Sequence, residues 1–237
     1  MDPEVSVVIP VYNEEGILQS AVVDLHQSLV ELELDGFEII LSENGSTDET
    51  ISVADRHCSR FPEVRYLTST ESNYGKALKR AILEARGRYV FCDEIDLCDV
   101  DFYRRALVRL RDEGYDMVVG SKLLEASFDK RGWYRHTASR IINKMLKVST
   151  GFRGTDTHGL KAFRREAVVP AVERCLVDRD LFASELVIRV ERTRNLRKTE
   201  IPLFVAEKRP PSINLVRRVP HVLKNMAQLA YVIRIKR

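Results

Sequence analysis

The chain has 237 residues, 44% of them hydrophobic, and we expect a soluble, globular protein with the core of one domain, or of a domain with a short appendage. Its 38 Lys and Arg residues against 35 Asp and Glu residues give a net charge of +3, too small to predict nucleic-acid binding. The absence of an apolar run of roughly 18 residues argues against a membrane span, and the acidic start MDPEVSV argues against a secretory signal.

The four cysteines are Cys58, Cys92, Cys98 and Cys175, and they show neither CxxC spacing nor a neighbouring pair of histidines. We therefore expect reduced, structural thiols and neither a zinc site nor a disulfide framework. Together with the missing signal segment, this favours a cytoplasmic location.

The first expected element is a strand over residues 5–9, a mainly β-branched run that is typical of a buried parallel strand. Pro10 cannot donate a hydrogen bond to a neighbouring strand, so we expect the strand to end there. Asn13 can cap a following helix, in which apolar residues recur at helical spacing over residues 17–25. The loop between them lies at the carboxyl end of a strand, where open α/β sheets bind ligands.

The same alternation of strand, polar loop and helix continues along the chain. Expected strands cover residues 37–42, 64–67, 88–92, 117–120, 160–163 and 198–202, and expected helices cover residues 49–59, 75–86, 101–113, 137–146 and 180–193. Strands that alternate with helices of about ten residues predict an α/β fold with a doubly wound, mainly parallel sheet.

Two carboxylates, Glu94 and Asp96, follow the expected strand at 88–92 with one residue between them. In a strand-end loop such a pair can converge on one hard cation, because Mg²⁺ and Mn²⁺ commonly take one or two carboxylates together with substrate phosphates. A solvated acidic loop or a helix cap has the same composition. The pair alone leaves both interpretations open.

The last thirty or so residues are basic and amphipathic. One helical face, bordered by Arg and Lys residues, is apolar. It carries Val219, Val222, Leu223, Met226, Ala230 and Ile233. This pattern suits an anionic membrane surface, but a terminal helix packed on the domain or a dimer contact would also show it. We divide the chain into a main domain, residues 1–206, and a basic amphipathic C-terminal segment, residues 207–237.

Six motifs, taken together, give the chain a resemblance to a known family. They are VSVVIPVYNEE at 5–15, ENGSTDET at 43–50, NYGKALKRAI at 73–82, EID at 94–96, RHTASRIIN at 135–143 and DTHGLKAFRRE at 156–166. In this order they resemble the family 2 glycosyltransferases with the GT-A nucleotide-sugar fold, and among these the dolichyl- or polyprenyl-phosphate mannose and glucose synthases.

The resemblance implies an inverting enzyme that transfers mannose or glucose from a GDP- or UDP-sugar to a polyprenyl phosphate. It also implies a set of residues that bind the nucleotide sugar: Pro10, Tyr12, Glu14, Glu43, Asn44, Lys76, Asp93 and Lys122. Glu94 and Asp96 match the ligands of Mg²⁺ or Mn²⁺, and Asp96 also matches a residue of the reacting centre. This chain departs from the family pattern at Glu43-Asn44, where two acids are usual, and at Glu94, where Asp is usual.

A phosphate acceptor changes what the site must supply. With a second pKa near 6, a lipid monophosphate is largely a dianion at pH 7, so it needs cationic groups more than a general base. By the resemblance, Arg135, Ser139 and Arg209 match positions that contact the acceptor phosphate or the diphosphate. Asp156 is either a general base for a hydroxyl acceptor or a turn-capping residue.

Three partners and two alternative functions follow. We expect the nucleotide sugar, the polyprenyl phosphate, and a membrane surface reached peripherally on the cytoplasmic face, either directly or through a membrane partner protein. The alternatives are a glycosyltransferase with a hydroxyl acceptor and a protein that binds a nucleotide sugar without catalysis.

Overall fold

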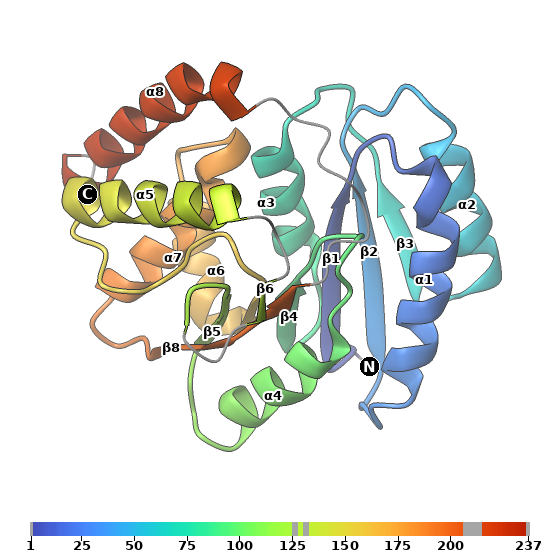
Figure 1. Cartoon of the computed structure of the whole chain (residues 1–237). Helices are drawn as coiled ribbons and strands as arrows, with labels where there is room; N and C mark the ends of the chain where they lie inside the picture. Colours follow the sequence, from blue (N-terminus) through green and yellow to red (C-terminus); the bar gives the residue numbers. More distant parts are fainter. Residues whose placement is uncertain (1, 125–127, 130–132, 206–214, 236–237) are drawn as a thin grey trace.

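The computed structural model describes residues 2–124, 128–129, 133–205 and 215–235, and in Figure 1 helices cover both faces of a central sheet. Within the described residues the sheet has seven strands in the order β3-β2-β1-β4-β7-β5-β8, and a further pair joins β6 to β9. The strands are β1 (Val5–Val11), β2 (Phe37–Glu43), β3 (Val64–Leu67), β4 (Tyr89–Cys92), β5 (Met117–Ser121), β6 (Phe128–Asp129), β7 (Lys161–Arg164), β8 (Lys198–Pro202) and β9 (Phe204–Val205).

The helices alternate with these strands. They are α1 (Glu15–Val30), α2 (Thr50–Arg60), α3 (Tyr74–Glu84), α4 (Val100–Arg111), α5 (Trp133–Thr150), α6 (Arg165–Glu173), α7 (Phe182–Arg192) and α8 (Leu215–Arg234), with the short 3₁₀ helix η1 (Arg179–Leu181) before α7. The predicted α/β fold with a mainly parallel sheet is confirmed. Only β7, among the strands of the sheet, runs against its neighbours β4 and β5.

Hydrophobic side chains fill the space on both faces of the sheet. Along β1, Val7 and Ile9 belong to the cluster shared with α1, α2 and α4, whereas Val8 belongs to the cluster shared with α3, α6 and α7. All three side chains have no exposed surface. Since successive side chains of a strand point to opposite faces, a strand buried on both sides is mainly apolar, as predicted, and the polar Ser6 is buried with its hydroxyl donating to Glu38.

The start of the chain differs from prediction at Pro10 and Asn13. Strand β1 continues past Pro10 to Val11. The Val8 carbonyl points toward β4 and accepts a hydrogen bond from the Asp93 N–H. Pro10, two residues further, faces the same way but lies beyond the end of β4, so its missing N–H leaves no strand partner without a hydrogen bond. Asn13 does not cap α1; it has φ 53° and its Oδ1 accepts from the Thr47 N–H at 2.8 Å.

Helix α6 was not predicted, because Pro170 interrupts its helical pattern and a proline normally removes a backbone hydrogen bond. The helix forms because Val168, Ala171 and Val172 are buried against the sheet. Tertiary packing outweighs the low propensity of a single residue here.

The predicted C-terminal amphipathic helix is present as α8, which lies beside α5 at the edge of the molecule in Figure 1. Its apolar face turns inward: Met226, Leu229, Val232 and Ile233 are at most 5% exposed. Met226 and Ile233, which we assigned to a face suited to a membrane, therefore belong to the hydrophobic core. None of the helices in the described ranges is long and apolar enough to span a membrane.

Candidate active site

Most of the predicted site residues lie at one edge of the sheet, where β1, β2, β4 and β5 end. The chain runs from β1 outward to β2 and β3, and then returns to place β4 on the other side of β1. In open α/β sheets such a reversal of strand order creates the crevice in which ligands bind. The reversed strand β7 starts at this same edge, because it is antiparallel to both β4 and β5.

The loops that follow β1 and β2 are hydrogen-bonded to each other. The backbone N–H groups of Asn13 and Glu14 donate to Ser46 Oγ at 3.0 Å and Thr50 Oγ1 at 2.8 Å. Asn13 Oδ1 accepts from Thr47 in return. These bonds fix the β1 loop to the start of α2, so the two loops form one support beside the crevice.

Glu43 and Asn44, at the end of β2, are almost fully buried. Glu43 accepts hydrogen bonds from the backbone N–H groups of Ser46 and Ser69, and Asn44 Oδ1 accepts from that of Asn73. Both side chains therefore hold neighbouring loops in place. Their contact with a nucleotide stays a prediction.

The other residues predicted for the nucleotide side are more accessible. Tyr12 is 43% exposed, and Pro10 and Glu14 are half-buried. Lys76 lies on the surface of α3 and forms an ion pair with Glu71 at 2.6 Å. They surround the crevice above β1 and β2 without lining the pocket described below.

The loop after β4 places three acids in succession. Asp93 is buried, and its carboxylate accepts hydrogen bonds from the Tyr103 hydroxyl and, at 2.6 Å, from the Glu94 N–H. Burial raises the pKa of Asp93 to about 7, and the hydrogen bond from Tyr103 only partly opposes this rise. Glu94 and Asp96 are half-buried on either side of Ile95, which is anchored in the core.

The carboxylates of Glu94 and Asp96 have no hydrogen-bond or ion-pair partner among the residues that the structure describes. Within that part of the chain, no group of three or more His, Cys, Asp or Glu side chains is placed to hold a metal ion. Any divalent cation here would rest on this pair and complete its coordination with substrate oxygens or water.

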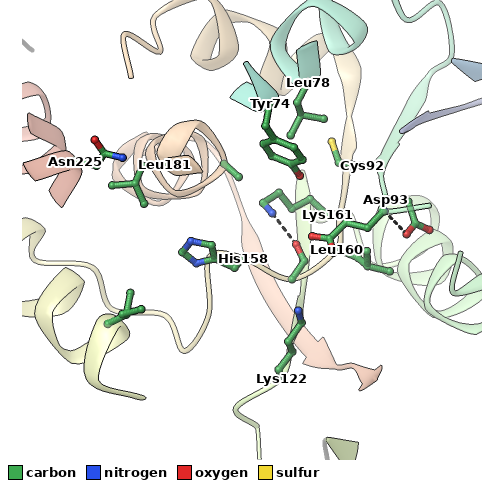
Figure 2. A pocket seen from close by; sticks show the side chains of 14 residues that line it. Tyr74, Leu78, Cys92, Asp93, Lys122, His158, Leu160, Lys161, Leu181 and Asn225 are labelled. Atoms are coloured by element: carbon green, nitrogen blue, oxygen red, sulfur yellow. Dashed lines mark hydrogen bonds between the residues drawn. The ribbon is translucent and has the colours of Figure 1, made fainter. Parts of the chain in front are cut away.

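A partly open pocket of about 400 Å³ lies next to this loop, shown in Figure 2. Its walls come from the ends of β4 and β5, the start of β7, and helices α3, α5 and α8 together with the region of η1 and α7. Asp93 and Glu94, which are adjacent in the sequence, line it together with the distant Lys122 and with His158. The structure thus brings two of the predicted acids and one predicted cation to the same cavity, whereas Asp96 does not line it.

Asp156 lies below the surface and does not line this pocket. Its Oδ2 accepts from the Lys122 N–H at 3.1 Å and its Oδ1 accepts from the His158 N–H at 2.8 Å. Both carboxylate oxygens therefore tie the loop before β7 to the end of β5. Its role as a general base stays a prediction.

The remaining predicted residues are Arg135, Ser139 and Arg209. Arg135 and Ser139 belong to the first half of α5, but their side chains are outside the described part of the structure, as is the whole of Arg209.

Comparison with known proteins agrees with this arrangement. The family model "Glycosyl transferase family 2" matches residues 6–170. The chain belongs to glycosyl transferase family 2. Similar proteins include "Glycosyltransferase AglD" of Haloferax volcanii, 30% identical over 91% of this chain and 35% of that protein.

Two further relatives are named "Undecaprenyl-phosphate 4-deoxy-4-formamido-L-arabinose transferase". The protein of Proteus mirabilis is 32% identical over 73% of this chain and 52% of its own length, and that of Serratia proteamaculans is 31% identical over 86% and 60%. The chain thus spans about a third to three-fifths of the length of these relatives.

The fold is also that of solved glycosyltransferase structures. Crystal structures of glucosyl-3-phosphoglycerate synthase from Mycobacterium tuberculosis, one with Mn²⁺, UDP and glucosyl-3-phosphoglycerate and another with Mg²⁺ and UDP, are 21% identical to this chain. The first covers 96% of this chain and 80% of its own, with a TM-score of 0.67. At this identity the likeness shows the GT-A fold alone.

Lys161 was not identified as a site residue from the sequence. It is the first residue of β7, it is 4% exposed, and its Nζ donates to the Gly159 carbonyl at 2.6 Å within the pocket wall. The signal was present: a lysine stands between Leu160 and Ala162 in an otherwise apolar strand. Its antiparallel pairing, which carries it to the carboxyl edge, could not be inferred from the pattern.

Cys92 lies opposite Lys161 across the β4–β7 ladder. Burial raises the pKa of the Cys92 thiol to about 12, so this cysteine is an inert part of the pocket wall. All four cysteines are free, as expected.

Gly159 determines the shape of the pocket floor. A Cβ atom at this position would lie 1.6 Å from the Gly120 carbonyl oxygen. The Gly120 N–H in turn donates to the Leu160 carbonyl at 2.8 Å. The two backbones can approach this closely only because residue 159 has no side chain.

Proposed function

We propose that the chain catalyses transfer of a hexose from a nucleoside-diphosphate sugar to a polyprenyl phosphate, with inversion at the anomeric carbon. The observation that carries the proposal is the pocket that joins Glu94, at the end of β4, to Lys122, at the end of β5. Glu94, one of the two carboxylates suited to a divalent cation, thus borders a cavity that Lys122 and Lys161 also line. The Proteus and Serratia relatives are named as transferases of undecaprenyl phosphate, which supports this acceptor class.

The donor would lie over the loops after β1 and β2. We propose a GDP- or UDP-linked mannose or glucose, held by Pro10, Tyr12, Glu14, Glu43, Asn44, Lys76, Asp93 and Lys122. Tyr12 offers an exposed ring to the base or ribose. The mutual hydrogen bonds of the two loops keep this side preorganised.

Glu94 and Asp96 fit a Mg²⁺ or Mn²⁺ ion, because both carboxylates lack a partner among the described residues and stand at the strand end. When bound, such an ion neutralises charge that develops on the nucleoside diphosphate as it leaves. The two crystal structures with Mn²⁺ or Mg²⁺ belong to a protein of the same fold, which supports a metal here.

The acceptor side has to bind an anion and position it. A phosphate monoester is already charged at pH 7, so its oxygen can attack without a general base. We assign this binding to Arg135, Ser139 and Arg209 together with the cationic pocket wall. The two backbone hydrogen bonds on Asp156 argue for a positioning role and against a general base for a hydroxyl acceptor.

We further propose that α5 and α8 rest on an anionic membrane surface, where a polyprenyl phosphate keeps its tail. Neither helix contains an Asp or Glu. Exposed apolar side chains project from both helices: Ile141, Met145 and Val148 from α5, and Tyr231 near the end of α8. Exposed Arg140, Lys144, Lys147, Lys224 and Arg234 surround them. This combination of apolar and basic groups is what an interfacial helix presents to anionic lipid.

The experiment that tests the reaction measures release of UDP or GDP from a panel of sugar nucleotides with Mg²⁺ or Mn²⁺. Each donor is incubated with and without a short-chain polyprenyl phosphate in detergent. We expect release that needs both the lipid phosphate and the metal, and that falls at least about a hundredfold in Asp96→Ala.

Asp24→Ala, which removes an exposed carboxylate of α1, serves as the control and should leave the rate unchanged. Donor binding without release for any phosphate acceptor would favour the hydroxyl-acceptor enzyme or the non-catalytic binding protein. Release that is independent of metal would remove Glu94 and Asp96 from the proposed role.

A further inference from the structure

Lys161 is a buried cation with few partners. An ammonium group has three N–H donors, and that of Lys161 makes one hydrogen bond, to the Gly159 carbonyl. Among the described residues it has no further hydrogen bond and no carboxylate within ion-pair distance. A charge that is 4% exposed and so weakly satisfied is costly unless an anion completes its surroundings.

The ammonium of Lys161 is held in a fixed place. Figure 2 shows it in the pocket wall, where a dashed line joins it to the Gly159 carbonyl. That carbonyl belongs to the residue whose backbone lies against Gly120, so its position cannot shift freely. Lys122 lines the same cavity, and its side chain has no hydrogen-bond or ion-pair partner among the described residues.

Burial makes the charge of Lys161 costly, and an anion in the cavity would offset that cost. Burial lowers the pKa of Lys161 and Lys122 adds to this effect, whereas the carboxylates of Asp156 and Glu94 act against it. A dianionic phosphate in the cavity would stabilise the charged form of both lysines.

We propose that Lys161 and Lys122 form an anion subsite in the pocket that binds a phosphate oxygen of a substrate. The inference deepens the proposed function and rests on it. Two substrate groups have this chemistry: the diphosphate of the donor and the monophosphate of the lipid acceptor. Lys161 then contacts the substrate and preorganises charge where the reaction needs it.

The test compares Lys161→Met with Lys79→Met by calorimetric titration. Lys79 is a suitable control, because its ammonium also donates to backbone carbonyls, those of Glu173 and Cys175, but does not line the pocket. One arm titrates UDP and GDP with Mg²⁺, and the other titrates farnesyl phosphate. Uridine and farnesol, which lack phosphate, report on binding that does not depend on the subsite.

We expect Lys161→Met to weaken binding in at least one arm by about ten- to a hundredfold, the range of a lost hydrogen bond to a charged group. Uridine and farnesol binding should be unchanged, and so should every ligand with Lys79→Met. The affected arm identifies the phosphate that occupies the subsite. Removing an unsatisfied buried charge should also leave the melting temperature equal or higher, unlike the loss of a structural residue.

Changes below twofold in both arms with a folded Lys161→Met would overturn the subsite. If that variant does not fold, Lys161→Gln, which keeps a polar tip without the charge, is titrated in its place and judged by the same limits. Inorganic pyrophosphate separates the two hypotheses. If pyrophosphate binds in a way that depends on Lys161, but UDP, GDP and farnesyl phosphate do not bind, the subsite is supported and the proposed function is contradicted. If none of these ligands binds, both are contradicted.

Discussion

Gly159 is the single position in the site with the least room for change. Its substitution by Ala would press a Cβ atom into the Gly120 carbonyl, and relief requires the loop before β7 to move. We expect Gly159→Ala to lower the free energy of unfolding by about 3 kcal/mol or more. Gly16→Ala is the matched control: it lies in α1 with nothing within 4 Å of the new Cβ, and should raise stability by about 0.5–1 kcal/mol. Urea denaturation of both variants measures the difference, and equal effects would contradict this account.

Glu38 should make the free energy of unfolding depend on pH. It is a buried residue of β2 that accepts hydrogen bonds from Ser6 Oγ at 2.7 Å, Arg65 Nε at 2.9 Å and the Arg86 N–H at 2.7 Å. Burial acts to raise the pKa of Glu38, but these hydrogen bonds and the charge of Arg65 outweigh it, and the pKa is lowered. Stabilisation is therefore complete above the unfolded-state pKa of about 4.3 and is lost as the pH falls through the lower, folded-state pKa.

We expect Glu38→Gln to cost about 2 kcal/mol at pH 7, and the difference from the unmodified protein to shrink steadily below about pH 4. Denaturation curves between pH 3 and pH 7 measure this. Glu31→Gln, at an exposed position, provides the control and should follow the unmodified protein at every pH. A constant difference between Glu38→Gln and the unmodified protein would show that the charge of Glu38 is not what matters.

For single residues, the sequence predicted those site residues that a local pattern identifies. The pair Glu94 and Asp96 was found from its spacing after a strand, and Lys122 from its place after the next strand together with the resemblance to the family. Asn13 was misassigned as a helix cap because its partner, Thr47, lies in another loop. Lys161 was missed because neither its burial nor its place in the pocket follows from its sequence neighbours.

Among the elements, Asn73 connects α3 to two other parts of the fold. Its Oδ1 accepts from the N–H groups of Lys76, in the first turn of α3, at 3.1 Å and of Arg179, in η1, at 3.0 Å. Its Nδ2 donates to Asp178 at 3.0 Å, and its own N–H donates to Asn44 beyond β2. The side chain is both a helix cap and a bridge over more than a hundred residues.

Asn73→Ala should therefore cost about 2–3 kcal/mol, more than the roughly 1 kcal/mol of an isolated cap, because it also leaves buried backbone groups unpaired. Asn73→Asp keeps the oxygen acceptor and should recover part of the loss. Thermal unfolding of both variants, with the exposed Asn195→Ala as reference, gives the measurement. A loss no larger than that of Asn195→Ala would rule out the bridging role.

The strands next to β1 were predictable because each is a mainly apolar run of residues followed by a polar loop. The direction of β7 was not, because its four residues follow a loop whose path depends on contacts of Asp156, Thr155 and Glu200 with distant strands. Helix α6 escaped prediction for the opposite reason: a local signal, Pro170, was overruled by burial.

For the whole molecule, the distribution of charge and exposed apolar surface makes the proposed membrane contact testable. Val148 of α5 is 73% exposed and Val108 of α4 is 49% exposed, on different helices. We expect Val148→Glu to weaken binding to vesicles that contain anionic lipid by about tenfold, and Val108→Glu to have no effect. Sedimentation with the vesicles measures both variants.

Raising the salt concentration should weaken the same binding, since exposed charges are screened. Binding that is equal for neutral and anionic vesicles, or that Val108→Glu and Val148→Glu reduce alike, would argue against this face as the contact surface.

Because β7 runs against its neighbours, the loop before it and its own first residue bring Asp156, His158 and Lys161 to one half of the crevice, while the other half is formed by the loops after β1 and β2, over a hundred residues earlier in the chain. The two halves are therefore encoded separately. Under the proposed function, we expect exchange of residues 151–160 between relatives to alter the acceptor and to leave the nucleotide side intact. An enzyme of the proposed kind could then acquire new acceptors by changes in one loop, without rebuilding the strands that support the donor side.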